Sequence, residues 1–116
     1  MSLDARRRSE IIGPRRGIHV VTTGAVFAQP VAEIGLGFAL SLLRNIHGAD
    51  ADFRAGREKW GGAGNGAARL LTGADVGIIG FGDLGRAVAR VLTGFQPRLM
   101  IHDPWLPESR IREAGA

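Results

Sequence analysis

Apolar and polar positions near the carboxyl end of the chain follow the pattern of a strand, a helix and a second strand. Val76, Ile78 and Ile79 are β-branched and lie in an uncharged run, which is typical of a strand buried on both faces. Residues 98–102 (RLMIH) have the character of the next strand. Between them, apolar residues recur at helical spacing and form one stripe, namely Leu84, Val88, Val91 and Leu92. The pattern predicts a β-α-β unit with parallel strands, and therefore an α/β fold.

The first half of the chain contains a long stretch that is apolar on nearly every side. Residues 17–22 (GIHVVT) predict a strand, and residues 23–29 predict a loop. Pro30 suits the first position of a helix, which we expect to continue through residues 31–46 (VAEIGLGFALSLLRNI). The most apolar part, residues 34–43, is too short to cross a bilayer. We therefore expect this helix to be buried in protein, within its own domain or between subunits, and we expect no membrane partner.

Composition divides the chain into four parts. The predicted parts are a basic tail at residues 1–16, a strand, loop and long helix at 17–60, a glycine-rich loop and approach to the sheet at 61–72, and the first half of a dinucleotide-binding unit at 73–116. Only two strands of the expected parallel sheet occur in the last part. We therefore expect the sheet to be incomplete in this chain.

The net charge of +4 is concentrated in the tail. Five arginines and two acidic residues give residues 1–16 a charge of +3, which leaves +1 for the other 100 residues. Such tails can contact nucleic acid or anionic membranes, but a solvated terminus is the simpler interpretation, and we do not expect nucleic acid as a partner. The chain has no cysteine, which excludes disulfides and thiolate chemistry, and its start lacks the apolar segment of a signal peptide. We expect a cytoplasmic protein.

Three glycines follow the first predicted strand in the pattern G-x-G-x-x-G, at Gly80, Gly82 and Gly85. With 18 glycines among 116 residues, about 0.4 matches are expected by chance, so the pattern alone decides nothing. Its context is more specific, because a dinucleotide-binding unit requires a strand before the glycines, a helix after them and an acidic residue about 20 positions later. Asp103 meets the last requirement. Gly80 would allow the tight turn, Gly82 the approach of a pyrophosphate, and Gly85 close packing of helix on strand.

The charges around the glycines determine which nucleotide can bind. The backbone N–H groups of Asp83 and Leu84 would point at the pyrophosphate, although the Asp83 carboxylate opposes a phosphate there and Arg86 could neutralise only part of its charge. Asp103 would accept hydrogen bonds from the adenine ribose and repel a 2′-phosphate, which favours NAD over NADP. Alternatively, Asp103 only starts a turn before Pro104. The candidate cofactor-binding residues are Gly80, Phe81, Gly82, Asp83, Leu84, Gly85 and Asp103.

Five unlike features occur in one order along residues 17–115. They are GIHVVT, then QPVAE opening a long apolar helix, then Arg54, Gly56 and Trp60, then LTGADVGIIGFGDLGRAVA, and finally HDPW. In this order they resemble the D-isomer-specific 2-hydroxyacid dehydrogenases. The resemblance implies a partial Rossmann-type NAD-binding domain of an oxidoreductase acting on 2-hydroxy acids, with NAD as cofactor and a homodimer to which the long helix contributes. That family often has a basic or neutral residue where this chain has Asp83.

Catalysis in the family uses an arginine that binds the substrate carboxylate and a histidine, supported by an acid, that donates the proton. The resemblance places these residues downstream of the matched segment. The histidines of this chain, His19, His47 and His102, do not replace them, and His102 and Asp103 are consecutive strand residues that point to opposite faces. We therefore predict no catalytic residue, no metal site and no activity for this chain alone. A 2-hydroxy or 2-oxo acid would bind only with further sequence.

Two other functions remain open at this point. One is a non-enzymatic nucleotide-binding or dimerisation module that keeps the fold without the chemistry. The other is a basic-tailed nucleic-acid binder, for which binding to DNA would depend steeply on salt.

Overall fold

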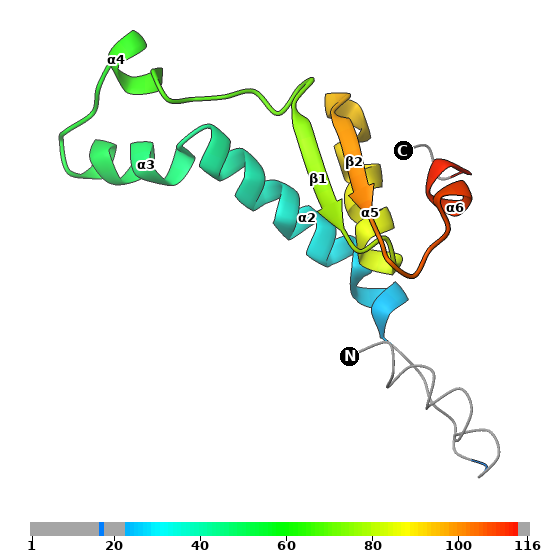
Figure 1. The fold of residues 1–116 in the computed structure, drawn as a ribbon. Helices are drawn as coiled ribbons and strands as arrows, with labels where there is room; N and C mark the ends of the chain where they lie inside the picture. The colour runs from blue at the N-terminus through cyan, green and yellow to red at the C-terminus, as the bar shows by residue number, and fades with distance from the viewer. Residues whose placement is uncertain (1–16, 18–22, 114–116) are drawn as a thin grey trace.

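The computed structural model describes residue 17 and residues 23–113 (Figure 1). Helices α2 and α3 form an arm, α4 lies above α3 in the view, and two strands and α5 lie to one side of α2 (Figure 1). In chain order the elements are α2 (Gly24–Leu43), α3 (Ile46–Arg54), α4 (Gly62–Asn65), β1 (Asp75–Ile79), α5 (Asp83–Leu92), the 3₁₀ turn η2 (Thr93–Phe95), β2 (Arg98–His102) and α6 (Glu108–Glu113).

The β-α-β unit predicted near the carboxyl end is present. β1 and β2 pair in parallel, with Ile78 opposite Ile101, and α5 connects them. β2 has the predicted bounds, and β1 begins one residue earlier than expected, at Asp75. Asp75 and Arg98 are opposite each other in the register, and the Arg98 Nη2 donates to Asp75 Oδ2 at 2.9 Å. The predicted α/β fold, in the form of part of a Rossmann-type domain, is confirmed.

The strands are covered on one face only, whereas the sequence predicted that the first of them, β1, is buried on both. The side chains of one face, Val76, Ile78, Leu99 and Ile101, are buried or half-buried. On the opposite face, Ile79 is 89% exposed and Met100 is 61% exposed. Strands that are apolar on both faces are typical of parallel sheets covered by helices on both sides. The part of the chain that the structure describes supplies cover for a single side.

Helix α2 begins earlier than predicted. It starts at Gly24, so that residues 24–29 are helical and Pro30 lies inside the helix, not at its first position. The expected loop at 23–29 is therefore wrong. Ala28 lies in this early part and is buried against α5, so tertiary packing outweighs the proline as a signal for where the helix starts. At the other end, Asn45 adopts a left-handed conformation, with φ 50°, between α2 and α3.

Two further expectations concern segments around α2. The glycine-rich segment 61–66, expected as a loop, contains the short helix α4. The strand expected at residues 17–22 falls mostly on residues 18–22, which lie outside the described residues.

Helix α2 is longer than the apolar stretch from which its length was predicted. With 20 residues and a mean hydropathy of 1.6, α2 is long and apolar enough to cross a membrane by length and composition. The prediction that it is too short considered only residues 34–43 and is wrong. Apolar helices in the core of a soluble protein meet the same criteria, so length and composition alone do not assign α2 to a membrane.

The core lies where α2 crosses α5. Ala28 and Ala32 of α2 are buried against Ala87 of α5, with Val88 and Val91 packed beside them. Small side chains let the two helix backbones approach closely. Leu84, expected on the buried stripe, is 45% exposed, because the helix turns its alanine face toward α2. The close contact fixes where the first turn of α5 lies relative to the start of α2.

Candidate nucleotide-binding site

The loop from β1 to α5 turns sharply at Gly80. Its φ of 88° lies in the region that favours glycine. The Gly80 N–H donates to the His102 carbonyl at 2.8 Å, which extends the strand pairing to the start of the loop. Gly85 is required for a different reason, since a Cβ there would overlap the Gly80 carbonyl oxygen. These two glycines hold the first turn of α5 directly against the end of β1.

Gly82 leaves the start of α5 open. It is the N-terminal cap residue of α5 and has no side chain to accept from the first backbone N–H groups. A Cβ at Gly82 would meet no atom within 4 Å, so the space in front of this helix end is not filled by the described residues. The first N–H groups of a helix have no partner within the helix and attract anions. The geometry therefore fits a pyrophosphate at this position.

Asp103 lies at the end of β2 and accepts two backbone hydrogen bonds. Its Oδ2 accepts from the Phe81 N–H at 2.7 Å, and its Oδ1 accepts from the Trp105 N–H at 2.8 Å. The Phe81 bond, followed by the Trp105 bond, lowers the pKa of Asp103 below its ordinary value and keeps the carboxylate charged. The Trp105 contact is the turn proposed as the alternative role of Asp103. A carboxylate can accept about four hydrogen bonds, so a ribose contact stays possible as well and stays a prediction.

Phe81 contributes in a way that the sequence did not reveal. Its side chain is 1% exposed beneath the loop, and it is the largest fully buried side chain among the described residues. Its N–H donates to Asp103, and its carbonyl accepts from Arg86 Nη1 at 3.0 Å. Phe81 thus anchors the loop, and its backbone polar groups are already occupied by protein. The spacing of 22 residues between Phe81 and Asp103, across one β-α-β unit, was the available signal for this contact.

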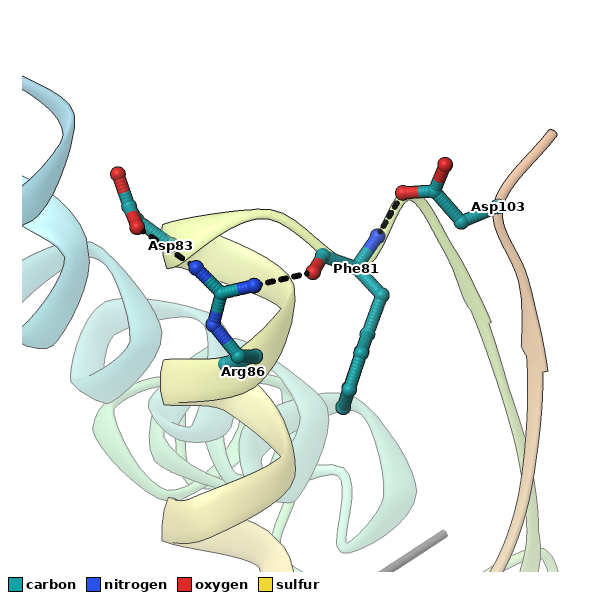
Figure 2. A network of polar contacts seen from close by, with 4 residues as sticks. All are labelled: Phe81, Asp83, Arg86 and Asp103. Atoms are coloured by element: carbon teal, nitrogen blue, oxygen red, sulfur yellow. Dashed lines mark hydrogen bonds and ion pairs between the residues drawn. The ribbon is translucent and has the colours of Figure 1, made fainter. Parts of the chain in front are cut away.

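Asp83 and Arg86 form the ion pair that their spacing predicted. Arg86 Nη2 lies 2.9 Å from Asp83 Oδ1, and both side chains are partly exposed. Figure 2 shows Asp83 on the side of α2 and Asp103 on the opposite side of the loop, with Arg86 and Phe81 between them. The carboxylate expected to oppose a phosphate is therefore directed away from Asp103. Leu84 follows at the exposed first turn of α5.

The histidines occupy three separate places. His47 Nδ1 lies 3.2 Å from Ser41 Oγ, His102 is exposed at the end of β2, and His19 lies outside the described residues. Within residues 23–113, no group of three or more metal-ligating side chains comes together.

The chain is similar in sequence to known dehydrogenases. A family model described as D-isomer specific 2-hydroxyacid dehydrogenase, NAD binding domain, matches residues 36–116. Hydroxypyruvate reductase of Thermotoga maritima is 34% identical over 94 residues, covering 81% of this chain and 30% of that protein. Glyoxylate reductase of Thermococcus litoralis is 30% identical over 106 residues, covering 88% of this chain and 32% of that protein.

Solved structures agree with these matches. The crystal structure of a phosphoglycerate oxidoreductase from Rhizobium etli is 59% identical, with a TM-score of 0.84, and covers 92% of this chain and 36% of that one. Salmonella D-lactate dehydrogenase is 27% identical, with a TM-score of 0.60, and covers 99% of this chain and 32% of that one. The chain spans about a third of the length of these proteins.

Proposed function

The chain belongs to the D-isomer specific 2-hydroxyacid dehydrogenase family, in which it matches the NAD-binding domain, and from this premise we propose that it supplies the half-site for the ADP portion of NAD. The match confirms the family and the cofactor that the sequence predicted, and we propose that the whole protein is an oxidoreductase acting on 2-hydroxy acids. The observation that carries the proposal is the open N-terminus of α5 at Gly82, next to the charged Asp103 at the end of β2.

Different residues of the loop would bind different parts of the cofactor. The N–H groups of Asp83 and Leu84 would donate to the pyrophosphate, and Gly82 would leave room for it. Asp103, which is held in place by the Phe81 N–H, would accept hydrogen bonds from the hydroxyls of the adenine ribose. NAD supplies the hydride acceptor or donor when bound, so that a 2-oxo acid, NADH and a proton give a 2-hydroxy acid and NAD⁺. No residue of this chain is assigned to that step.

The charge of Asp103 also sets the choice between NAD and NADP. A 2′-phosphate on the ribose would bring negative charge to a carboxylate that two backbone N–H groups keep ionised. NAD should therefore bind more tightly than NADP. Calorimetric titration of the full chain with NAD⁺ and NADP⁺ tests both proposals. Absence of NAD⁺ binding would contradict the half-site, and equal affinities would contradict the selectivity.

A matched pair of variants sharpens this titration. Asp103→Asn keeps the size of the side chain but removes the charge, so the ratio of NADP to NAD affinity should rise. Asp75→Asn changes an acid of the same sheet at the far end of β1, away from the loop, and should leave the ratio unchanged. A rise in both variants would show a general effect of net charge instead of a contact with the ribose.

A dimer is the second part of the proposal, and α2 supports it. One side of α2 packs on α5, while another side carries an exposed apolar stripe, 44–70% exposed, made of Phe27, Val31, Ile34, Phe38 and Leu42. An apolar surface of this kind is typical of protein interfaces, and a two-fold dimer would bury the same stripe on both subunits. This gives the apolarity of α2 a reason other than a membrane. Sedimentation that finds only monomer at micromolar concentration would contradict it.

The whole protein's substrate follows from the same premise. We propose a small 2-hydroxy or 2-oxo acid, the class of substrate named for the hydroxypyruvate and glyoxylate reductases that the chain is similar to. A non-enzymatic module for dimerisation is the second candidate, and the exposed stripe of α2 is the observation that favours it. We propose that the protein is cytoplasmic, and the absence of cysteine is compatible with this localisation.

A further inference from the structure

The direction of the Asp83 side chain points to a role other than opposing the cofactor. We propose that Asp83 is a positioning residue, which holds Arg86 on the Phe81 carbonyl and ties the glycine loop to the start of α2. The proposal rests on the half-site for NAD proposed above. Asp83 is an acidic residue directly beside the expected position of a phosphate.

Arg86 joins the Asp83 carboxylate to the backbone of the glycine loop. Its guanidinium donates from Nη2 to Asp83 Oδ1 at 2.9 Å and from Nη1 to the Phe81 carbonyl at 3.0 Å (Figure 2). An arginine side chain on an exposed helix face has many rotamers, and a fixed carboxylate three residues earlier selects one of them. The Asp83 carboxylate therefore determines whether Arg86 stays on the loop backbone.

The Asp83 carboxylate also lies beside the start of helix α2. A Cβ on Gly24 would lie 3.0 Å from Asp83 Oδ2, so this oxygen is beside the first residue of α2. Helix α2 has no acidic residue in its first turn, and its N-cap Thr23 makes no side-chain hydrogen bond. Negative charge is favourable at such a helix end. Asp83 supplies that charge from α5, and in doing so links the two helices next to the loop.

The result is a chain of hydrogen bonds across the nucleotide loop. It runs from Asp83 through Arg86 to the Phe81 carbonyl, and the Phe81 N–H continues it to Asp103, while Asp83 Oδ2 lies beside the first residue of α2. Both peptide groups flanking Phe81 are thereby fixed. A loop held in this way presents the N–H groups of α5 and the Asp103 carboxylate in a set relative position, which reduces the ordering needed when the cofactor binds.

The two possible roles of Asp83 predict opposite signs. If its charge mainly repels the pyrophosphate, Asp83→Asn should bind NAD more tightly. If Asp83 positions the loop, Asp83→Asn should bind NAD about two- to tenfold more weakly, because a neutral amide oxygen accepts a weaker hydrogen bond from Arg86 than the carboxylate does. Arg86→Gln should weaken binding similarly, the double variant should be no weaker than either single one, and Asp83→Glu should recover most of the affinity.

Titration of the full chain with NAD⁺ measures these affinities. Asp50→Asn is the matched control, because Asp50 forms an ion pair of the same length, 2.9 Å, with Arg54 on α3, away from the loop. The affinity of this control should be unchanged. Unchanged or tighter binding in Asp83→Asn would overturn the proposal, and so would additive losses in the double variant.

Hydrogen exchange without cofactor separates this proposal from the half-site for NAD. In Asp83→Asn the Phe81 amide should exchange several-fold faster, while the amides of β2 keep their rates. Equal exchange at Phe81 in the two proteins would overturn the positioning role whether or not NAD binds. If the unmutated chain binds no NAD⁺, the half-site fails, and the exchange result alone decides the role of Asp83.

Discussion

At the scale of single residues, Asp103 combines a structural role with the proposed selectivity for NAD. It begins the turn after β2 through the Trp105 N–H, and it braces the glycine loop through the Phe81 N–H. The two interpretations drawn from the sequence, a turn residue and a ribose acceptor, are therefore not exclusive. The structural contacts make the carboxylate rigid and charged, which are the properties that a ribose-binding acid needs.

The lowered pKa of Asp103 makes stability depend on pH. A carboxyl whose pKa is lower in the folded chain than in the unfolded one, where it is about 3.9, stabilises the fold above that value. The contribution is lost as the pH falls through the folded-state pKa. We expect the difference in unfolding free energy between the unmutated chain and Asp103→Asn to shrink as the pH falls below about 4. Urea denaturation at several pH values measures it, and a constant difference would contradict the assignment.

Gly85 and Gly82 should respond differently to the same change. A Cβ at Gly85 would overlap the Gly80 carbonyl, so Gly85→Ala should cost about 1–3 kcal/mol of unfolding free energy. A Cβ at Gly82 would enter open space, so Gly82→Ala should leave stability nearly unchanged but weaken NAD binding. Denaturant unfolding and NAD⁺ titration of both variants check this. Similar loss of stability in the two would contradict the assigned packing.

At the scale of elements, α2 and the sheet each have one side that packs against the rest of the chain and one side that is exposed. α2 buries Ala28 and Ala32 against α5 and exposes the apolar stripe that includes Phe38, which is 66% exposed. The sheet buries Ile78 and exposes Ile79 and Met100. Either exposed surface could drive self-association of this chain, and only the stripe on α2 corresponds to the dimer proposed above.

Matched variants distinguish the two surfaces. Phe38→Glu places a charge in the α2 stripe, and Met100→Glu places the same charge on the exposed sheet face, at a residue of similar exposure. Because burying an unpaired charge is costly, Phe38→Glu should raise the dimer dissociation constant at least tenfold, and Met100→Glu should leave it near the unmutated value. Sedimentation equilibrium measures both. The reverse order would assign association to the sheet.

How far these elements could be predicted depends on where their signals lie. The bounds of β2 could be predicted, because its five residues lie between the predicted helix and Asp103. The start of α5 could be predicted from the G-x-G-x-x-G pattern. The start of α2 did not follow, because Pro30 is a local signal and the contact of Ala28 with α5 is a tertiary one. The hydrogen bond from the Phe81 N–H to Asp103 was also not predicted, because it joins a backbone group to a side chain 22 residues later.

At the scale of the whole molecule, the described part contains one side of a dinucleotide crevice. In Rossmann-type sheets the crevice lies between the first strand and the strand across the switch point, and the second half of the sheet surrounds the nicotinamide. Only β1 and β2 occur among residues 23–113. The proposed half-site for the ADP portion of NAD therefore lies among the described residues, and none of them is assigned to the nicotinamide.

Because the nicotinamide has no residues assigned to it, we predict that the chain alone does not transfer hydride. Reduction of a 2-oxo acid requires the nicotinamide against the substrate carbon, a cation for the carboxylate and a proton donor about 3 Å from the carbonyl oxygen. His47 and His102 lie on separate elements, and neither is paired with an acid in the described residues. Misplacement of one reacting group alone costs about a hundredfold in rate.

The test is to mix the purified chain with NADH and glyoxylate, pyruvate or hydroxypyruvate and to follow NADH absorbance. We expect the rate of the protein-free control. A contaminating enzyme is recognised by Gly82→Val, purified in parallel, because an activity that persists in this variant does not use the glycine loop. Turnover that co-purifies with the unmutated chain and disappears in Gly82→Val would show that the chain carries catalytic groups that neither its motifs nor its described contacts reveal.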